Sequence, residues 1–100
     1  MQSVSPRSST VDSPNWRQTY EVILNEEVSS SEEFKSDFSI NGTPMGSNWR
    51  VDSIVGSKLE WFVEAVLFED YGYQLQVGDK IAICSISRRV GSEWIEVWTA

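Results

Sequence analysis

Side chains that could act as nucleophiles are present in this chain, but the base that usually activates them is not. The only cysteine is Cys84, serines are plentiful, and the 100 residues include no histidine. Nucleophilic serine and cysteine sites commonly use an imidazole as general base, and most catalytic zinc sites use one as a ligand. Cys84 lies in an apolar run, where a cysteine usually behaves as a small apolar residue. We therefore expect no enzymatic activity and no metal or nucleotide cofactor.

Carboxylates are the other groups that could do chemistry. Glu60 and Glu64 share a strand face but stand about 13 Å apart by strand rise, which is farther than the paired carboxylates of glycosidases. A second set surrounds a triple serine and lacks the spacing of an EF-hand loop. It consists of Glu26, Glu27, Glu32 and Glu33. We interpret this acidic patch as a solvated loop, with binding of a cation or a basic partner as the alternative.

The C-terminus offers the strongest candidate for an interaction site. Two runs of β-type residues, 81–90 and 93–98, flank Gly91-Ser92, and a two-residue loop that begins with glycine is typical of a hairpin. The resulting register pairs Arg89 with Trp94, Ser87 with Glu96, and Ser85 with Trp98. Because side chains alternate across a strand, one hairpin face should carry the candidate interaction residues Trp94, Trp98, Arg89, Glu96 and Ser87.

The two tryptophans on this otherwise polar face admit two interpretations. Exposed tryptophan is typical of binding sites, because a large apolar ring with one polar group suits both protein and sugar ligands. Alternatively, the 25–33 loop, the N-terminal segment or a neighbouring strand covers both indoles. The opposite hairpin face is predicted to face the core, apart from Arg88 near the tip. It consists of Ala82, Cys84, Ile86, Arg88, Ile95 and Val97.

The elements that must position this hairpin are mostly predicted strands. Residues 16–24, 49–55 and 58–69 carry β-type residues, and the last range gives the strongest signal. Residues 34–40 fit a strand by their alternation, although Ser30 with Glu33 resembles the capping box of a short helix. We favour the strand. About six strands with short turns predict an all-β fold, a small antiparallel sandwich or barrel.

Residues 1–14 are predicted to be a flexible N-terminal arm, followed by a single β domain over residues 15–100. The first segment is rich in serine, has Pro6 and Pro14, and has too few apolar residues to fold alone. It also has no apolar stretch of the kind a secretory signal requires. We therefore expect a soluble chain located in a virion or in the cytoplasm.

The net charge of −7, from 15 acidic and 8 basic residues, restricts the possible partners. Phosphate backbones and anionic lipid surfaces would be repelled, so we expect neither nucleic acid nor membrane as a partner. Other protein subunits are the expected partners, in a homo-oligomer or hetero-oligomer, and a carbohydrate is a further candidate.

Three functions are compatible with these observations. The first is a non-enzymatic structural or accessory subunit of a larger assembly, such as a decoration, cement or tail protein of a phage or viral particle, with the N-terminal arm ordered against neighbouring subunits. The second is a carbohydrate-binding or ligand-binding β module that uses Trp94 and Trp98. The third is an acidic inhibitor of a protein with a basic, nucleic-acid-handling groove.

Overall fold

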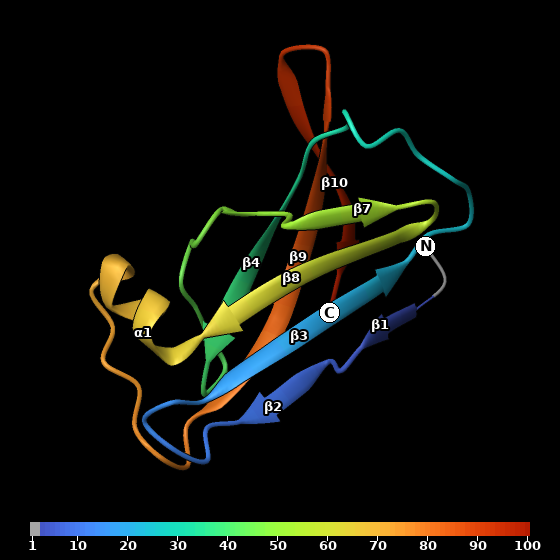
Figure 1. The fold of residues 1–100 in the computed structure, drawn as a ribbon. Helices are drawn as coiled ribbons and strands as arrows, with labels where there is room; N and C mark the ends of the chain where they lie inside the picture. The colour runs from blue at the N-terminus through green and yellow to red at the C-terminus, as the bar shows by residue number, and fades with distance from the viewer. Residues whose placement is uncertain (1–2) are drawn as a thin grey trace.

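The computed structural model describes residues 3–100, which form two antiparallel sheets packed against each other (Figure 1). Sheet A has the strand order β1 (Ser3–Ser5), β3 (Arg17–Ile23), β8 (Lys58–Glu64) and β7 (Ser53–Val55). Sheet B has the order β10 (Glu93–Thr99), β9 (Lys80–Val90), β4 (Phe34–Ile40) and β5 (Thr43–Pro44), and β2 (Ser8–Thr10) pairs with β9 and β6 (Trp49–Arg50) with β4. The predicted all-β fold is confirmed, in its sandwich form.

The core lies between the sheets and is built by alternation along their longest strands. In β3 from Tyr20 onward and throughout β8 of sheet A, every second residue points inward and is fully buried, while most of its neighbours on the outer face are polar. These inward residues are Tyr20, Val22, Leu59, Trp61 and Val63. Sheet B contributes Phe34 and Phe38 from β4 and Ile81, Ile83 and Ile86 from β9. Residues 34–40 therefore form a strand, as favoured over a helix.

A bulge in β9 changes which of its residues reach the core. Ser85 pairs with Asp37 of β4 and Ile83 pairs with the next residue, Phe38, so Cys84 is left over between them. Beyond this point the side chains of β9 change faces, and Ile81 and Ile83 become the buried ones. The prediction that Ala82 and Cys84 face the core is wrong, because it assumed an uninterrupted strand.

The predicted strand over residues 58–69 ends early. β8 stops at Glu64, and the next residues form a single helical turn, α1 (Ala65–Phe68), followed by the 3-10 turn η1 (Glu69–Tyr71). The turn buries Phe68, whose ring centroid lies 5.4 Å from that of Trp49, and it leaves Val66 on the surface. Alternation alone did not predict this turn, because a run that is apolar at every position fits a strand and a helix equally well.

Residues 49–55 form two short strands in different sheets, where the sequence predicted one strand. β6 pairs with β4 of sheet B, and β7 pairs with β8 of sheet A. Between them, Asp52 is hydrogen-bonded to β8 through its own amide and through its carboxylate, which accepts from the amide of Phe62. The segment therefore crosses from one layer to the other.

Residues 3–11, predicted to belong to a flexible arm, take part in both sheets. β1 pairs with β3, and β2 pairs with the start of β9. Val4 and Val11 are buried, and Val11 is only 1% exposed. Few apolar residues suffice here, because the backbone is satisfied by pairing with existing strands. Met1 and Gln2, the first residues of the predicted arm, lie outside the described residues.

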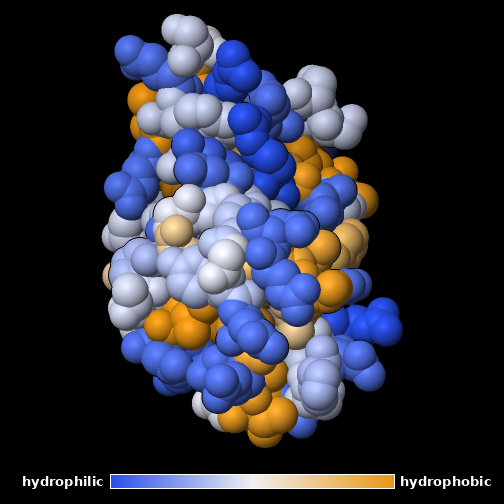
Figure 2. Space-filling model, turned by 90° about the vertical axis from the view of Figure 1, so that its left-hand side faces the viewer, coloured by the Kyte–Doolittle hydropathy of each residue, from blue (hydrophilic) through white to orange (hydrophobic). Residues whose placement is uncertain are grey.

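Hydrophobic side chains are dispersed on the side of the molecule that carries α1. Figure 2 views that side, and its hydrophobic atoms form separate small patches among hydrophilic ones. Within residues 3–100, no helix has the length and apolar composition needed to cross a lipid bilayer.

Candidate interaction site on the C-terminal hairpin

The hairpin of β9 and β10 follows the predicted register over most of its length. Val90 lies opposite Glu93, Arg89 opposite Trp94, and Ser87 opposite Glu96. Gly91 makes the turn with φ of 65°, a left-handed conformation that glycine adopts without the strain a Cβ would cause. The tip of the hairpin projects beyond the other strands, at the top of Figure 1.

A second bulge separates the two tryptophans that were predicted to share a face. The register shifts between Glu96 and Trp98, so that Trp98 lies opposite Ile86 instead of Ser85. Because Ile86 points into the core, Trp98 does too, and it packs partly buried against the core cluster. The guanidinium carbon of Arg7 lies 6.0 Å from the Trp98 ring centroid. The side chain of Arg7 from the N-terminal segment thus lies over the Trp98 ring, and the predicted common face is corrected to Trp94, Arg89, Ser87 and Glu96.

On this outer face Trp94 is surrounded by cations that sequence reasoning did not find. Lys35 Nζ lies 4.7 Å and Arg50 Cζ 4.5 Å from the centroid of the Trp94 ring. These distances fit cation–π contacts. Register explains them, since Lys35 pairs with Ser87 on one side and with Arg50 on the other. Lys35 and Arg50 come from strands far from the hairpin in sequence, so only the order of strands could have identified them.

A polar groove runs beside Trp94 on the same outer face. Its lining contains charged, amide and hydroxyl side chains, namely Lys35, Ser36, Asp37, Asn48, Ser85, Ser87 and Glu96, together with Trp94 and Gly46. Asp37 is held in place because its carboxylate accepts hydrogen bonds from the amide and the hydroxyl of Ser47. An aromatic ring beside fixed polar groups could bind a small polar ligand such as a sugar.

The inner face of the hairpin is apolar and lies partly uncovered. Val90, Ile95 and Val97 are 58%, 44% and 42% exposed. Ile95 lies opposite Arg88 and shares the face of Ile86, so it lies on the predicted core face. That face extends past the end of sheet A, and therefore the prediction that Ile95 and Val97 are core residues is wrong. Large apolar side chains left together on one exposed face are typical of an interface.

A groove connects this apolar surface to the end of β3. It is lined by Leu24, Asn25, Glu26, Phe34, Arg88 and Val97. Leu24 also packs against the core and Phe34 belongs to it, so the groove borders the core at the inner face of the hairpin. Val90, Ile95 and Val97 together with this groove make up the hairpin surface.

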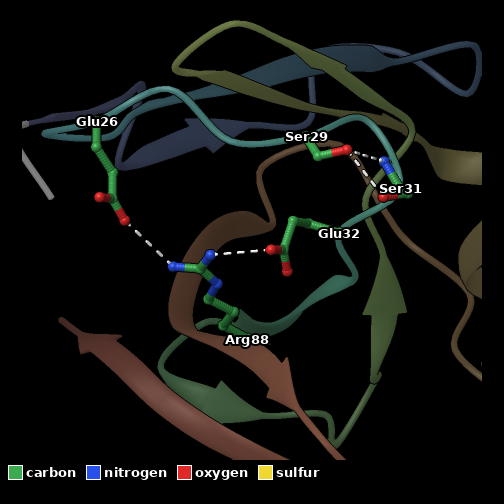
Figure 3. Close-up of polar contacts among 5 residues, drawn as sticks. All are labelled: Glu26, Ser29, Ser31, Glu32 and Arg88. Atoms are coloured by element: carbon green, nitrogen blue, oxygen red, sulfur yellow. Dashed lines mark hydrogen bonds and ion pairs between the residues drawn. The ribbon is translucent and has the colours of Figure 1, made fainter.

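The predicted acidic patch is largely paired with arginines of the hairpin and β6. Arg88 binds Glu26 at 3.4 Å and Glu32 at 3.1 Å (Figure 3). Glu33 binds Arg50 at 3.2 Å and Arg89 at 3.1 Å. These hydrogen-bonded carboxylates raise the pKa of Arg88, although its burial opposes them. Within residues 3–100, Glu27 is the one member of the patch without an ion pair.

Cys84 is half-buried and carries a poorly reactive thiol. Its Sγ donates to the backbone carbonyl of Asp37 at 3.3 Å. Burial, followed by the negative charge of Asp37, raises the pKa of the thiol to about 11. At neutral pH the group is therefore protonated, which is the opposite of what an activated nucleophile requires.

No family model, curated protein or solved structure matches this chain. A functional interpretation therefore rests on the residues and surfaces of the molecule itself.

Proposed function

We propose that this protein is a non-enzymatic subunit of a larger protein assembly, and that it contacts its neighbour through the hairpin surface. The observation that carries this proposal is the exposure of Val90, Ile95 and Val97 on one face of a projecting hairpin. Covering such a face removes apolar area from water, which favours association by roughly 25 cal/mol per Å² before the costs of ordering.

The contact is assigned to the hairpin and not to an N-terminal arm. An arm was expected to order against neighbouring subunits, but β1 and β2 already pair with this chain's own strands. The sequence predicted that the assembly is a phage or viral particle. Sizing of the native complex separates this case from a smaller complex.

The test combines sizing of the untagged protein from its native source with site-specific crosslinking. A photo-crosslinking residue at Val97 should join the chain to a subunit that co-migrates with it in a fixed ratio. The same residue at Val55, which is 64% exposed on sheet A, is the matched control and should not. The variant Val97→Lys should release the chain from the complex while its circular dichroism stays unchanged. Elution as a free monomer, or equal crosslinking from both positions, would contradict the proposal.

A second candidate function is sugar binding in the groove beside Trp94, supported by the aromatic ring and the fixed carboxylate of Asp37. Substitutions of the two tryptophans should therefore have different effects. Trp94→Ala should abolish quenching of tryptophan fluorescence by an oligosaccharide, whereas Trp98→Ala should lower stability and leave binding intact. Absence of quenching across a panel of neutral and acidic oligosaccharides would exclude this function.

The third function is inhibition of a protein that has a basic groove, and no feature of the described residues favours it. The acidic patch that suggested it is mostly occupied by Arg50, Arg88 and Arg89.

A further inference from the structure

The outer edge of β10 has no neighbouring strand among residues 3–100, and the direction of its backbone groups can be derived. The amide of Arg89 donates to the carbonyl of Glu33, so it points away from β10. Arg89 and Trp94 are therefore a pair without mutual hydrogen bonds. In such a pair the N–H and C=O groups of each residue point away from the partner strand. The N–H and C=O of Trp94, and those of Glu96 two residues later, face the open edge.

The two sides of this edge differ in chemistry. On the inner side, Ile95 and Val97 are apolar and more than two-fifths exposed. On the outer side, Glu96 follows Trp94. Within the described part of the chain, neither Glu93 nor Glu96 forms an ion pair, whereas the nearby Glu33 neutralises two arginines. The carboxylates of Glu93 and Glu96 are therefore not held in ion pairs, and Lys35 and Arg50, the cations nearest this edge, lie against the Trp94 ring.

We propose that the neighbouring subunit adds an extended segment to the open edge of β10, and that this segment alternates aliphatic and basic residues. The inference rests on the proposed function, because it specifies how the partner meets the hairpin. Strand addition satisfies the outward backbone groups of Trp94 and Glu96, while alternate side chains meet the two sides of the edge. Aliphatic residues fit Ile95 and Val97, and basic residues fit Glu96.

The occupant is a different chain and not a second copy. Each copy has a net charge of −7, so pairing two copies brings like charges together. The bulge after Glu96 and the charge of Glu96 itself are also devices by which edge strands avoid pairing with identical edges. A segment with basic residues avoids both problems, because it is attracted to the negatively charged chain and to the carboxylate of Glu96.

The probe is a blocked heptapeptide with the sequence Lys-Val-Lys-Val-Lys-Val-Lys. Its binding to the full chain is followed by fluorescence anisotropy and by amide hydrogen exchange. We expect binding that weakens with salt and slower exchange at the amides of Trp94 and Glu96. A peptide with glutamate in place of lysine tests the charge. In an antiparallel addition the lysines lie opposite Trp94 and Glu96, so a peptide N-methylated at the backbone amides of its lysines tests the backbone bonds. Both should bind at least about tenfold more weakly, since each loses more than one contact.

Two variants at one position separate the backbone from the side chain. Glu96→Ala removes only the carboxylate, whereas Glu96→Pro also removes the outward amide, at an edge position where proline is tolerated. We expect Glu96→Pro to bind the lysine peptide about fivefold more weakly than Glu96→Ala, the effect of one lost hydrogen bond. The N-methylated peptide gives the same information on the unmodified protein, so the test does not depend on how well the proline variant folds.

The outcomes separate this inference from the proposed function. If the lysine peptide does not bind, or if the N-methylated peptide binds equally well, strand addition is overturned even when Val97 crosslinks to a subunit of the native complex. If no subunit crosslinks at Val97, the proposed function fails, and the inference that depends on it fails as well.

Discussion

At the scale of single residues, Tyr20 is the clearest structural junction. Its hydroxyl donates to the carbonyl of Ile81 at 3.0 Å and accepts from the hydroxyl of Ser9 at 2.6 Å. Ser9 belongs to β2, Tyr20 to β3 and Ile81 to β9, so one phenol links the N-terminal segment to both sheets. Burial raises the pKa of Tyr20 to about 12, and the bond from Ser9 opposes that shift only in part.

Replacement of Tyr20 by phenylalanine should lower the free energy of unfolding by about 1–3 kcal/mol, because Ile81 and Ser9 lose a buried partner. Urea denaturation measures this change. Tyr73→Phe is the matched control, since Tyr73 is exposed and its substitution should stay within about 0.5 kcal/mol. Equal stability of the two variants would contradict the role assigned to Tyr20.

The same residue predicts a pH dependence. The folded protein favours the neutral phenol, so its contribution is fully present below pH 10.0 and is lost as the pH rises toward 12. In urea titrations between these values, the wild type should lose more stability than Tyr20→Phe. A constant difference between them across this range would show that Tyr20 is not desolvated as described.

Cys84 should react slowly with iodoacetamide. Raising the pKa of the thiol from 9.0 to about 11 lowers the thiolate fraction at pH 8, and hence the rate, by roughly a hundredfold. The comparison is between the native protein and the protein in urea, with mass spectrometry as the readout. Similar rates in the two conditions would indicate that the thiol is neither buried nor bonded to Asp37.

At the scale of elements, the N-terminal strands should behave as part of the domain. Trypsin should cut after Arg7 only as the whole domain unfolds, because the Arg7 carbonyl accepts from the amide of Ile83 and β2 is paired. Val11→Ala, which removes a buried side chain, should cost about 1–3 kcal/mol and accelerate this cleavage. Val77→Ala is the exposed control. Rapid removal of residues 1–7 from an otherwise intact domain would contradict this pairing and support the flexible arm predicted from the sequence.

The elements show where sequence reasoning works in this fold. The turn at Gly91-Ser92 fixed the pairing of Arg89 with Trp94, because a two-residue loop leaves one register. The bulges at Cys84 and after Glu96 could not be predicted, since each depends on what the neighbouring strand offers and not on local residue types. Each bulge exchanges faces beyond it, which is why Trp98 joined the core and Ala82 did not.

The candidate site was predictable to a similar extent. Trp94, Arg89, Ser87 and Glu96 were found because they belong to one hairpin. Lys35 and Arg50 were missed because β4 and β6 reach Trp94 only through the order of strands in sheet B. The exposure of Ile95 and Val97 depends on how far sheet A extends, which is a property of the packed molecule and has no local signal.

At the scale of the whole molecule, the net charge and the apolar hairpin surface have opposite effects on self-association. The charge opposes it, and the apolar surface favours it. At pH 7 the charge of −7 keeps copies apart, and near the sequence pI of about 4.4 that repulsion disappears. We expect self-association near pH 4.4, reversed at pH 7, when followed by light scattering. The double variant Ile95→Ser, Val97→Ser keeps the charge and should scatter less. Equal scattering would indicate that another surface is responsible.

The central place of β9 has a consequence for how the chain folds during synthesis. β9 pairs with β2, β4 and β10, and its pairing with β2 joins Ser8 to Ala82. Sheet B therefore cannot assemble until most of the chain has left the ribosome, whereas β3 and β8 of sheet A are available earlier. In that interval the apolar face of Leu59, Trp61 and Val63 lacks the part of its cover that β9 supplies, and a chaperone that binds exposed β-strands could recognise it.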